Sequence, residues 1–132
     1  MKKLTVFLLL ASSFSMAPVI RAQSAEEMAS DCKDIVEAKV ADGDTGIYVS
    51  HTFETGVCWG AFGTLQTAIT VVPRSFPKDP PLLEVCASKG STETQLVKIF
   101  MAYTGRHPEK LNQDFFFVAI AAFKEAFPCP NY

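Results

Sequence analysis

Residues 113–129 read QDFFFVAIAAFKEAFPC, a run of aromatic and small apolar residues with few charges. On a helix, successive residues turn by about 100°, so the large side chains gather on one face and a mostly alanine face adjoins it. We predict a helix from about Gln113 to Phe127, with Asn112 as its N-cap. Because most of its circumference is apolar, we expect it to be the central helix. The side chains predicted to face the core are Phe116, Ile120, Phe123 and Phe127.

Two capping boxes predict where earlier helices begin. The pattern Ser-x-x-Glu stands at residues 24–27 and Thr-x-x-Gln at residues 92–95. In each pattern, the two side chains satisfy backbone N–H groups that have no partner within the helix. Apolar residues follow both boxes at three- and four-residue spacing. The helix that begins at Ser24 is predicted to end near Val40. The helix that begins at Thr92 is predicted to end at Gly105, because glycine is typical just past a helix end.

A further helix is predicted from about Ser50 to Val71. Its apolar residues recur every three or four positions, but Gly56, Gly60 and Gly63 also lie in it. Glycine costs up to about 1 kcal/mol at each helical position. We interpret the three glycines as the place where a neighbouring helix approaches closely. A phosphate-binding loop is disfavoured, because no strand precedes the glycines and no Lys-Ser/Thr pair follows them.

The N-terminus has the pattern of a signal peptide, and this sets the meaning of the cysteines. Two lysines precede a short apolar run, which is too short to span a bilayer, and we predict cleavage after Ala22. The mature chain is then residues 23–132, a single exported domain without a membrane anchor. Twelve basic against 14 acidic residues and a net charge of −2 argue against a nucleic-acid-binding protein.

An even number of cysteines in a small exported chain indicates a disulfide framework. Cys32, Cys58, Cys86 and Cys129 are too widely spaced for the paired ligands of a zinc site. If the last two helices form an antiparallel hairpin, Cys86 lies near Cys129, and Cys32 is left to pair with Cys58. Other pairings stay open on the sequence alone. Each bridge is expected to stabilise the fold by about 3–4 kcal/mol.

These elements predict an all-α fold, a small four-helix bundle stapled by two disulfides. Residues 72–90 lie between the helix predicted at about 50–71 and the helix that begins at Thr92. They contain four prolines and are predicted to form a long, partly extended loop. The turn at residues 42–46, DGDTG, lacks the ligand spacing and closing glutamate of a calcium loop. We expect no metal and no cofactor.

The sequence also argues against an enzyme. A hydrolase needs a nucleophile, a base and an orienting group. All four cysteines are assigned to bridges, and His51 and His107 lie in different connections without a recognised nucleophile motif beside them. Two non-catalytic alternatives remain, a protein that binds and blocks a partner and a structural or adaptor module of the cell envelope.

Several segments of this chain together resemble the Rap/Tai family of immunity proteins, over about residues 28–129. The resemblance implies an all-α fold with disulfides, a periplasmic location and the neutralisation of a peptidoglycan amidase toxin delivered by type VI secretion. It is also compatible with a weak or moderate homodimer. The segments that carry it are Cys58-Trp59-Gly60-Ala61-Phe62, the proline-rich stretch to Cys86, Gln95-Leu96-Val97, His107-Pro108-Glu109, Ala121-Ala122-Phe123 and Phe127-Pro128-Cys129.

The proline-rich loop is the predicted partner-binding segment, with Arg74, Phe76 and Lys78 as its leading residues. Prolines stiffen a loop and so reduce the entropy lost on binding, and Arg and Phe are enriched in interfaces. The alternative is that Phe76 folds back onto the bundle and the two cations are only solvated. The next candidate is the segment Asp44–Thr52.

Two apolar side chains outside the core stripes point to a homodimer. Phe117 lies about 100° from the core stripe of the last helix, and Met101 lies off the stripe of the helix before it. Exposed apolar groups often mark interfaces.

Overall fold

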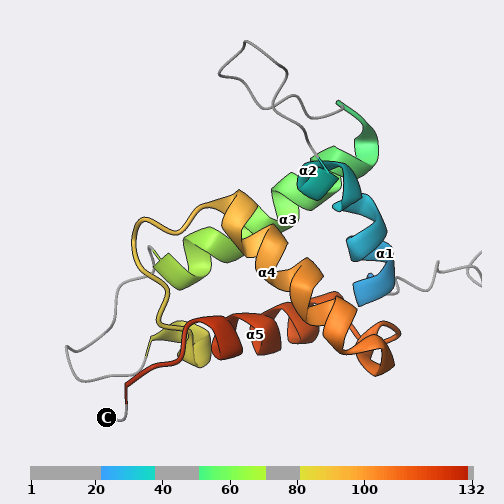
Figure 1. The fold of residues 1–132 in the computed structure, drawn as a ribbon. Helices are drawn as coiled ribbons and strands as arrows, with labels where there is room; N and C mark the ends of the chain where they lie inside the picture. The colour runs from blue at the N-terminus through green and yellow to red at the C-terminus, as the bar shows by residue number, and fades with distance from the viewer. Residues whose placement is uncertain (1–21, 38–50, 71–80, 131–132) are drawn as a thin grey trace, which may run out of the picture.

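The computed structural model describes residues 22–37, 51–70 and 81–130. In these ranges the fold is all-α, as predicted, with two short 3-10 helices and, apart from one isolated bridge, no β-structure (Figure 1). None of the helices in this part of the chain is long and apolar enough to cross a membrane. The elements are α1 (Ala25–Asp31), α2 (Lys33–Glu37), α3 (Phe53–Thr70), η1 (Leu82–Glu84), α4 (Glu93–Arg106), η2 (Pro108–Lys110) and α5 (Phe115–Ala126).

The first capping box is confirmed, but the helix that follows it is not continuous. Ser24 accepts a hydrogen bond from the Glu27 backbone N–H at 3.2 Å, and its own N–H donates to the Glu27 carboxylate at 2.8 Å. The predicted single helix from Ser24 instead divides into α1 and α2 at Cys32. The chain bends at this residue, whose side chain is covalently tied to α3. The predicted end near Val40 lies outside the described residues.

The central helix is α4, and the prediction that the last helix would be central is wrong. α4 packs against each of the other four α-helices, whereas the principal helical neighbours of α5 are α4 and α1 (Figure 1). Leu96, Val97 and Phe100 of α4 are completely buried. The Thr92 side chain caps this helix by accepting from the Gln95 N–H at 3.2 Å. α4 is therefore the helix around which the others are arranged.

The core is built on a cluster of aromatic rings from three helices. The fully buried Phe62 ring of α3 lies 5.5 Å from Phe100 of α4, centroid to centroid, and 5.5 Å and 6.3 Å from Phe115 and Phe123 of α5. The last two contacts are edge-to-face. Each such pair stabilises the fold by about 0.5–1.5 kcal/mol beyond the gain from burying the apolar surface of the rings. This cluster fixes α3, α4 and α5 relative to one another.

The start of α5 corrects two predictions. Its N-cap is Asp114, which accepts from the Phe116 N–H at 2.9 Å, and not Asn112, which is exposed in the preceding turn. The segment around Gln23 causes the shift, because the Gln23 carbonyl accepts from the Phe115 N–H at 2.9 Å and Ser24 forms the isolated bridge to Asp114. The core-facing side of the helix is correspondingly rotated, so that Phe116 is 40% exposed.

The end of α4 lies one residue beyond the predicted stop. The helix continues through Gly105 to Arg106, and the His107 N–H caps it by donating to the carbonyls of Tyr103 and Thr104. Gly105 is exposed, with open space where a Cβ would lie. The glycine therefore lies inside the last turn, and the proline at position 108 follows two residues after the helix end.

The three glycines of α3 do not share the role predicted for them. A Cβ at Gly56 or Gly60 would meet no atom within 4 Å, so no neighbouring helix of the described structure approaches them. A Cβ at Gly63 would lie 3.0 Å from Oε1 of Glu93, the first residue of α4. The close approach is thus limited to Gly63, and it involves a side chain and not a helix backbone.

This difference predicts opposite results for two matched substitutions. Gly60→Ala is expected to raise the free energy of unfolding by about 0.5–1 kcal/mol, because alanine has less backbone entropy to lose and the space is open. Gly63→Ala is expected to gain less than this, because the Glu93 carboxylate must move aside. Urea unfolding of the two variants followed by circular dichroism checks the order. A larger gain at position 63 would contradict this packing of Glu93 against α3.

Both predicted disulfides are confirmed. Cys32 is joined to Cys58, with 5.2 Å between their Cα atoms, and Cys86 is joined to Cys129, with 5.0 Å between theirs. The first connects the end of α1 to α3 inside the core, and the second connects the residues after η1 to the segment beyond α5. The antiparallel arrangement of α4 and α5 places the second pair together, as expected from the predicted hairpin.

Candidate functional site

The residues predicted to bind the partner lie between α3 and η1. Arg74, Phe76 and Lys78 fall outside the described residues, as does most of the next candidate, Asp44–Thr52. Within that second segment, His51 and Thr52 are described, and both are exposed. Thr52 has a local role, because its hydroxyl oxygen accepts from the Thr55 N–H at 3.1 Å at the start of α3.

The structure does describe the segment into which the proline-rich loop leads, Pro81–Ala87, which we call the clasp segment. Leu83 and Glu84 both have left-handed backbone conformations, with φ of 65° and 52°. Such conformations cost of order 1 kcal/mol or more for residues other than glycine and persist only where surrounding contacts hold them. Two contacts supply this support: the Glu84 N–H donates to the Pro81 carbonyl at 2.9 Å, and Val85 is completely buried.

Three interactions fasten the clasp segment to the C-terminal end of α5. The Cys86–Cys129 disulfide is one, and the Cys86 N–H donates to the Phe127 carbonyl at 3.0 Å beside it. The third is an ion pair in which Lys124 Nζ lies 2.7 Å from Oε2 of Glu84. One end of the loop that carries the predicted partner-binding residues is therefore fixed to the helical core.

The ion pair also makes this attachment sensitive to acid. The hydrogen bond from the Lys124 ammonium, together with its positive charge, lowers the pKa of the Glu84 carboxyl. A carboxyl whose pKa is lower in the folded chain than in the unfolded chain stabilises the fold above its unfolded-state pKa. That contribution is lost as the pH falls through the folded-state pKa.

We therefore expect Glu84→Gln to make stability less dependent on pH in the acidic range, below about pH 5. The change should be small and should shrink further in high salt, because both side chains are solvent-exposed. Urea unfolding of the wild type and the variant at several pH values measures it. An unchanged pH profile at low salt would mean that the ion pair contributes nothing in solution.

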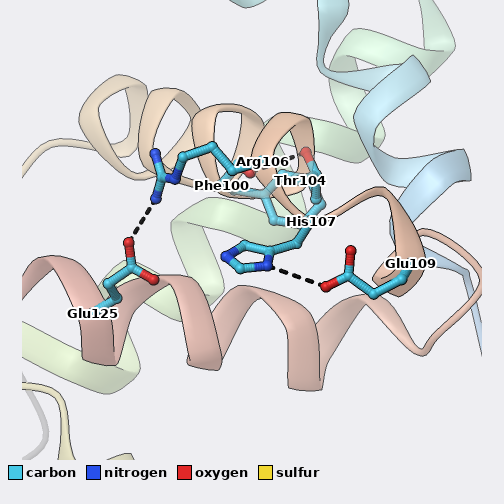
Figure 2. A network of polar contacts seen from close by, with 6 residues as sticks. All are labelled: Phe100, Thr104, Arg106, His107, Glu109 and Glu125. Atoms are coloured by element: carbon cyan, nitrogen blue, oxygen red, sulfur yellow. Dashed lines mark hydrogen bonds and ion pairs between the residues drawn. The ribbon is translucent and has the colours of Figure 1, made fainter.

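A second polar cluster lies where α4 ends beside α5 (Figure 2). Arg106 extends across to Glu125 of α5, with 2.6 Å between its Nη2 and the carboxylate Oε1. His107 Nδ1 lies 3.1 Å from Oε1 of Glu109, and its ring packs on Tyr103 with 4.4 Å between centroids. The pKa of the Glu109 carboxyl is lowered, first by a hydrogen bond from its own backbone N–H and then by His107.

Among the described residues, the contacts of His107 are those of a helix end, because its ring packs on Tyr103 and its Nδ1 faces Glu109. The nearby Thr104 hydroxyl is buried and donates back to the carbonyl of Phe100 at 3.1 Å (Figure 2). The Met101 carbonyl lies at the same distance from this hydroxyl. All four cysteines are in disulfides. Among the residues that the structure describes, no group of His, Cys, Asp and Glu has the arrangement of a metal site. The cluster lies at the surface beside the connection between α4 and α5, and its Arg106–Glu125 ion pair joins the two helices.

The exposed aromatic residues are the remaining candidates for contact with another protein. Phe117 is 70% exposed, as the sequence predicted, and its ring lies edge-on to that of Phe116 at 5.7 Å between centroids. Phe53, at the start of α3, is 82% exposed and was not predicted. Met101 is half-buried and packs against the core, so the prediction that it is exposed is wrong.

An open groove along the outer face of α4 was not predicted from the sequence. The sequence does contain a signal for its position, because Thr94, Lys98 and Ala102 recur every four residues on the side of the helix opposite the apolar stripe. A run of short and polar side chains on one face of a helix leaves a shallow depression. The groove is lined by Thr92, Thr94, Gln95, Lys98, Ile99 and Ala102.

Comparison with known protein families gives a match over most of the chain. A family model described as Rap1a immunity proteins matches residues 24–129. This range begins at the N-cap of α1 and ends at Cys129, so it includes every helix described above and both disulfides. No curated protein and no solved structure matches the chain.

Proposed function

The chain belongs to the Rap1a immunity protein family, and on that basis we propose that it protects its cell by binding a peptidoglycan amidase toxin of a type VI secretion system. The observation that carries the proposal is the extent of the family match, which includes the whole folded domain. The two disulfides support it, because disulfides persist in oxidising compartments such as the periplasm, where peptidoglycan is exposed to such a toxin.

We propose that the protein acts by covering the toxin's active site and not by catalysis. The proline-rich loop with Arg74, Phe76 and Lys78 is the segment proposed to enter the toxin cleft. A loop stiffened by prolines loses little entropy on binding. The described attachment of the clasp segment to α5 supports this proposal, because it holds one end of the loop on a rigid base.

Export is proposed to depend on a signal peptide at residues 1–22. Cleavage after Ala22 would leave every contact of the mature N-terminus intact, since these contacts begin at Gln23. Gln23 donates through its side-chain amide to Asp31 at 2.6 Å and accepts from the Phe115 N–H at 2.9 Å. The first residues of the proposed mature chain are thus part of the fold.

A homodimer in the periplasm is the second part of the proposal. The strongest support from the described surface is Phe117, whose exposed ring is paired with that of Phe116 on the same helix. Light scattering of the purified mature protein over a range of concentrations tests the dimer, and Phe117→Ser should shift the equilibrium to monomer. A monomeric mass at the highest soluble concentration would contradict it.

The inhibition itself is tested with purified components. Mature protein is titrated into a candidate peptidoglycan amidase toxin, and the release of cleaved peptidoglycan stems is measured. We expect hydrolysis to stop at a fixed molar ratio, and an unrelated muramidase in the same assay to be unaffected. Full amidase activity in the presence of a large excess of folded protein would overturn the proposal for that toxin.

A further inference from the structure

The two disulfides lie in very different surroundings. Cys32 and Cys58 are both completely buried, within the hydrophobic core cluster. Cys86 and Cys129 are only partly buried, and the prolines on either side of Cys129 are exposed. One bridge is therefore shielded from solvent by the helices, whereas the other lies at the surface near the end of the chain.

Access to sulfur decides which disulfide reacts with an external thiol. Exchange requires a thiolate to approach one sulfur of the bridge, so a buried disulfide reacts only after the surrounding structure opens. We propose that Cys86–Cys129 is a thiol-exchange site, the place where an external dithiol, such as a dithiol oxidoreductase of the envelope, acts on this protein. Cys32–Cys58 does not exchange while the core is folded.

The exchange follows ordinary disulfide chemistry. A thiolate of the dithiol attacks one sulfur of the bridge, the S–S bond breaks, and the other cysteine leaves as a thiolate. The second thiol of the dithiol then attacks the mixed disulfide. The dithiol is oxidised to its own disulfide, and Cys86 and Cys129 together accept two electrons and two protons.

Opening this bridge has a local structural consequence. The clasp segment would lose its covalent link to the chain beyond α5. The Cys86–Phe127 backbone hydrogen bond, the Glu84–Lys124 ion pair and the packing of Leu83, Val85 and Ala87 against the core would remain. These remaining contacts must then maintain two consecutive left-handed residues. We expect the clasp segment to detach from α5 far more often in the reduced protein than in the oxidised protein.

The rest of the fold should stay intact when this bridge opens. The ring cluster of Phe62, Phe100 and Phe123 involves no residue of the clasp segment, and the buried Cys32–Cys58 bridge still joins α1 to α3. The site therefore controls the attachment of the proline-rich loop separately from global folding. This inference does not depend on which toxin is bound.

The test is partial reduction of the full mature protein with dithiothreitol. Samples are quenched with iodoacetamide over time and their peptides are analysed by mass spectrometry. We expect Cys86 and Cys129 to be alkylated at least about tenfold faster than Cys32 and Cys58, so that a species with two labels accumulates. Equal rates at all four cysteines, or faster labelling of the core pair, would overturn the proposal.

Hydrogen exchange separates selective opening from general unfolding. In the species with two labels, the Cys86 amide should exchange much faster than in the oxidised protein, and the amides of α4 should keep their protection. The Cys86→Ser/Cys129→Ser double variant should give the same pattern without reductant and should retain its helical circular dichroism. Loss of protection throughout α4 in either sample would show that the bridge holds the whole fold together, and would contradict the proposal.

Discussion

Phe62→Ala is expected to lower the free energy of unfolding by about 3–5 kcal/mol, which is among the largest losses that a single core substitution causes. Phe62 is completely buried on α3, and its ring contacts aromatic side chains from α4 and α5. Truncation would remove apolar burial and leave a cavity where three helices meet. Domains of this size have a total stability of only about 5–15 kcal/mol, so the variant should be close to unfolding.

The matched control is Phe53→Ala on the same helix. Phe53 is 82% exposed, so its loss should change the free energy of unfolding by no more than about 0.5 kcal/mol. Urea unfolding of both variants, followed by circular dichroism, gives the comparison. Similar losses at the two positions would mean that the aromatic cluster is not the centre of the core.

The largest functional effect is expected from replacing Arg74, Phe76 and Lys78 together with alanine. If these residues bind the toxin, losing them should weaken affinity by about a thousandfold, because two central contact residues alone commonly contribute about 4 kcal/mol. The helical circular dichroism and Tm should stay close to those of the wild type. Isothermal titration with the amidase measures the affinity, and survival of cells that produce the toxin measures protection.

A control with the same residue types comes from the described surface. Lys33, Phe53 and Arg106 are all exposed and lie on α2, α3 and α4, outside residues 72–90. Replacing these three with alanine should leave protection intact. If the loop variant protects as well as this control does, the proline-rich loop does not bind the partner, and the segment Asp44–Thr52 becomes the next one to test.

The disulfide pairing could be predicted because it follows from topology. Two antiparallel helices near the C-terminus place the residues before the first beside the residues after the second, which is where Cys86 and Cys129 lie. The start of α1 was also predictable, because the reciprocal hydrogen bonds of Ser24 and Glu27 depend only on residues three positions apart. Such local patterns can be predicted because all the residues that form the interaction are close together in the sequence.

The errors concern contacts with distant parts of the chain. Asp114 rather than Asn112 caps α5, because the segment around Gln23 pairs with this turn from the other end of the sequence. The same pairing sets the rotation of α5 that leaves Phe116 at the surface. An apolar pattern identifies a helix, but it does not identify which apolar face turns inward when nearly the whole circumference is apolar.

The candidate site was predictable only in part. The proline-rich composition of residues 72–90 predicted a loop, and its role in partner binding stays a prediction. The predicted Cys86–Cys129 bridge, which attaches one end of this stretch, is confirmed. The left-handed backbone at Leu83 and Glu84 had no signal in the sequence, because neither is a glycine or an asparagine. Those conformations are supported by the hydrogen bond from the Glu84 N–H to the Pro81 carbonyl and by the burial of Val85.

Periplasmic co-expression tests the central claim most directly. A candidate peptidoglycan amidase toxin is directed to the periplasm of a susceptible host, alone or together with this protein carrying residues 1–22 or lacking them. We predict that the full chain prevents lysis, and that the chain without residues 1–22, retained in the cytoplasm, does not. Lysis that continues while the folded, disulfide-bonded protein is present in the periplasm would contradict its role as the immunity protein for that toxin.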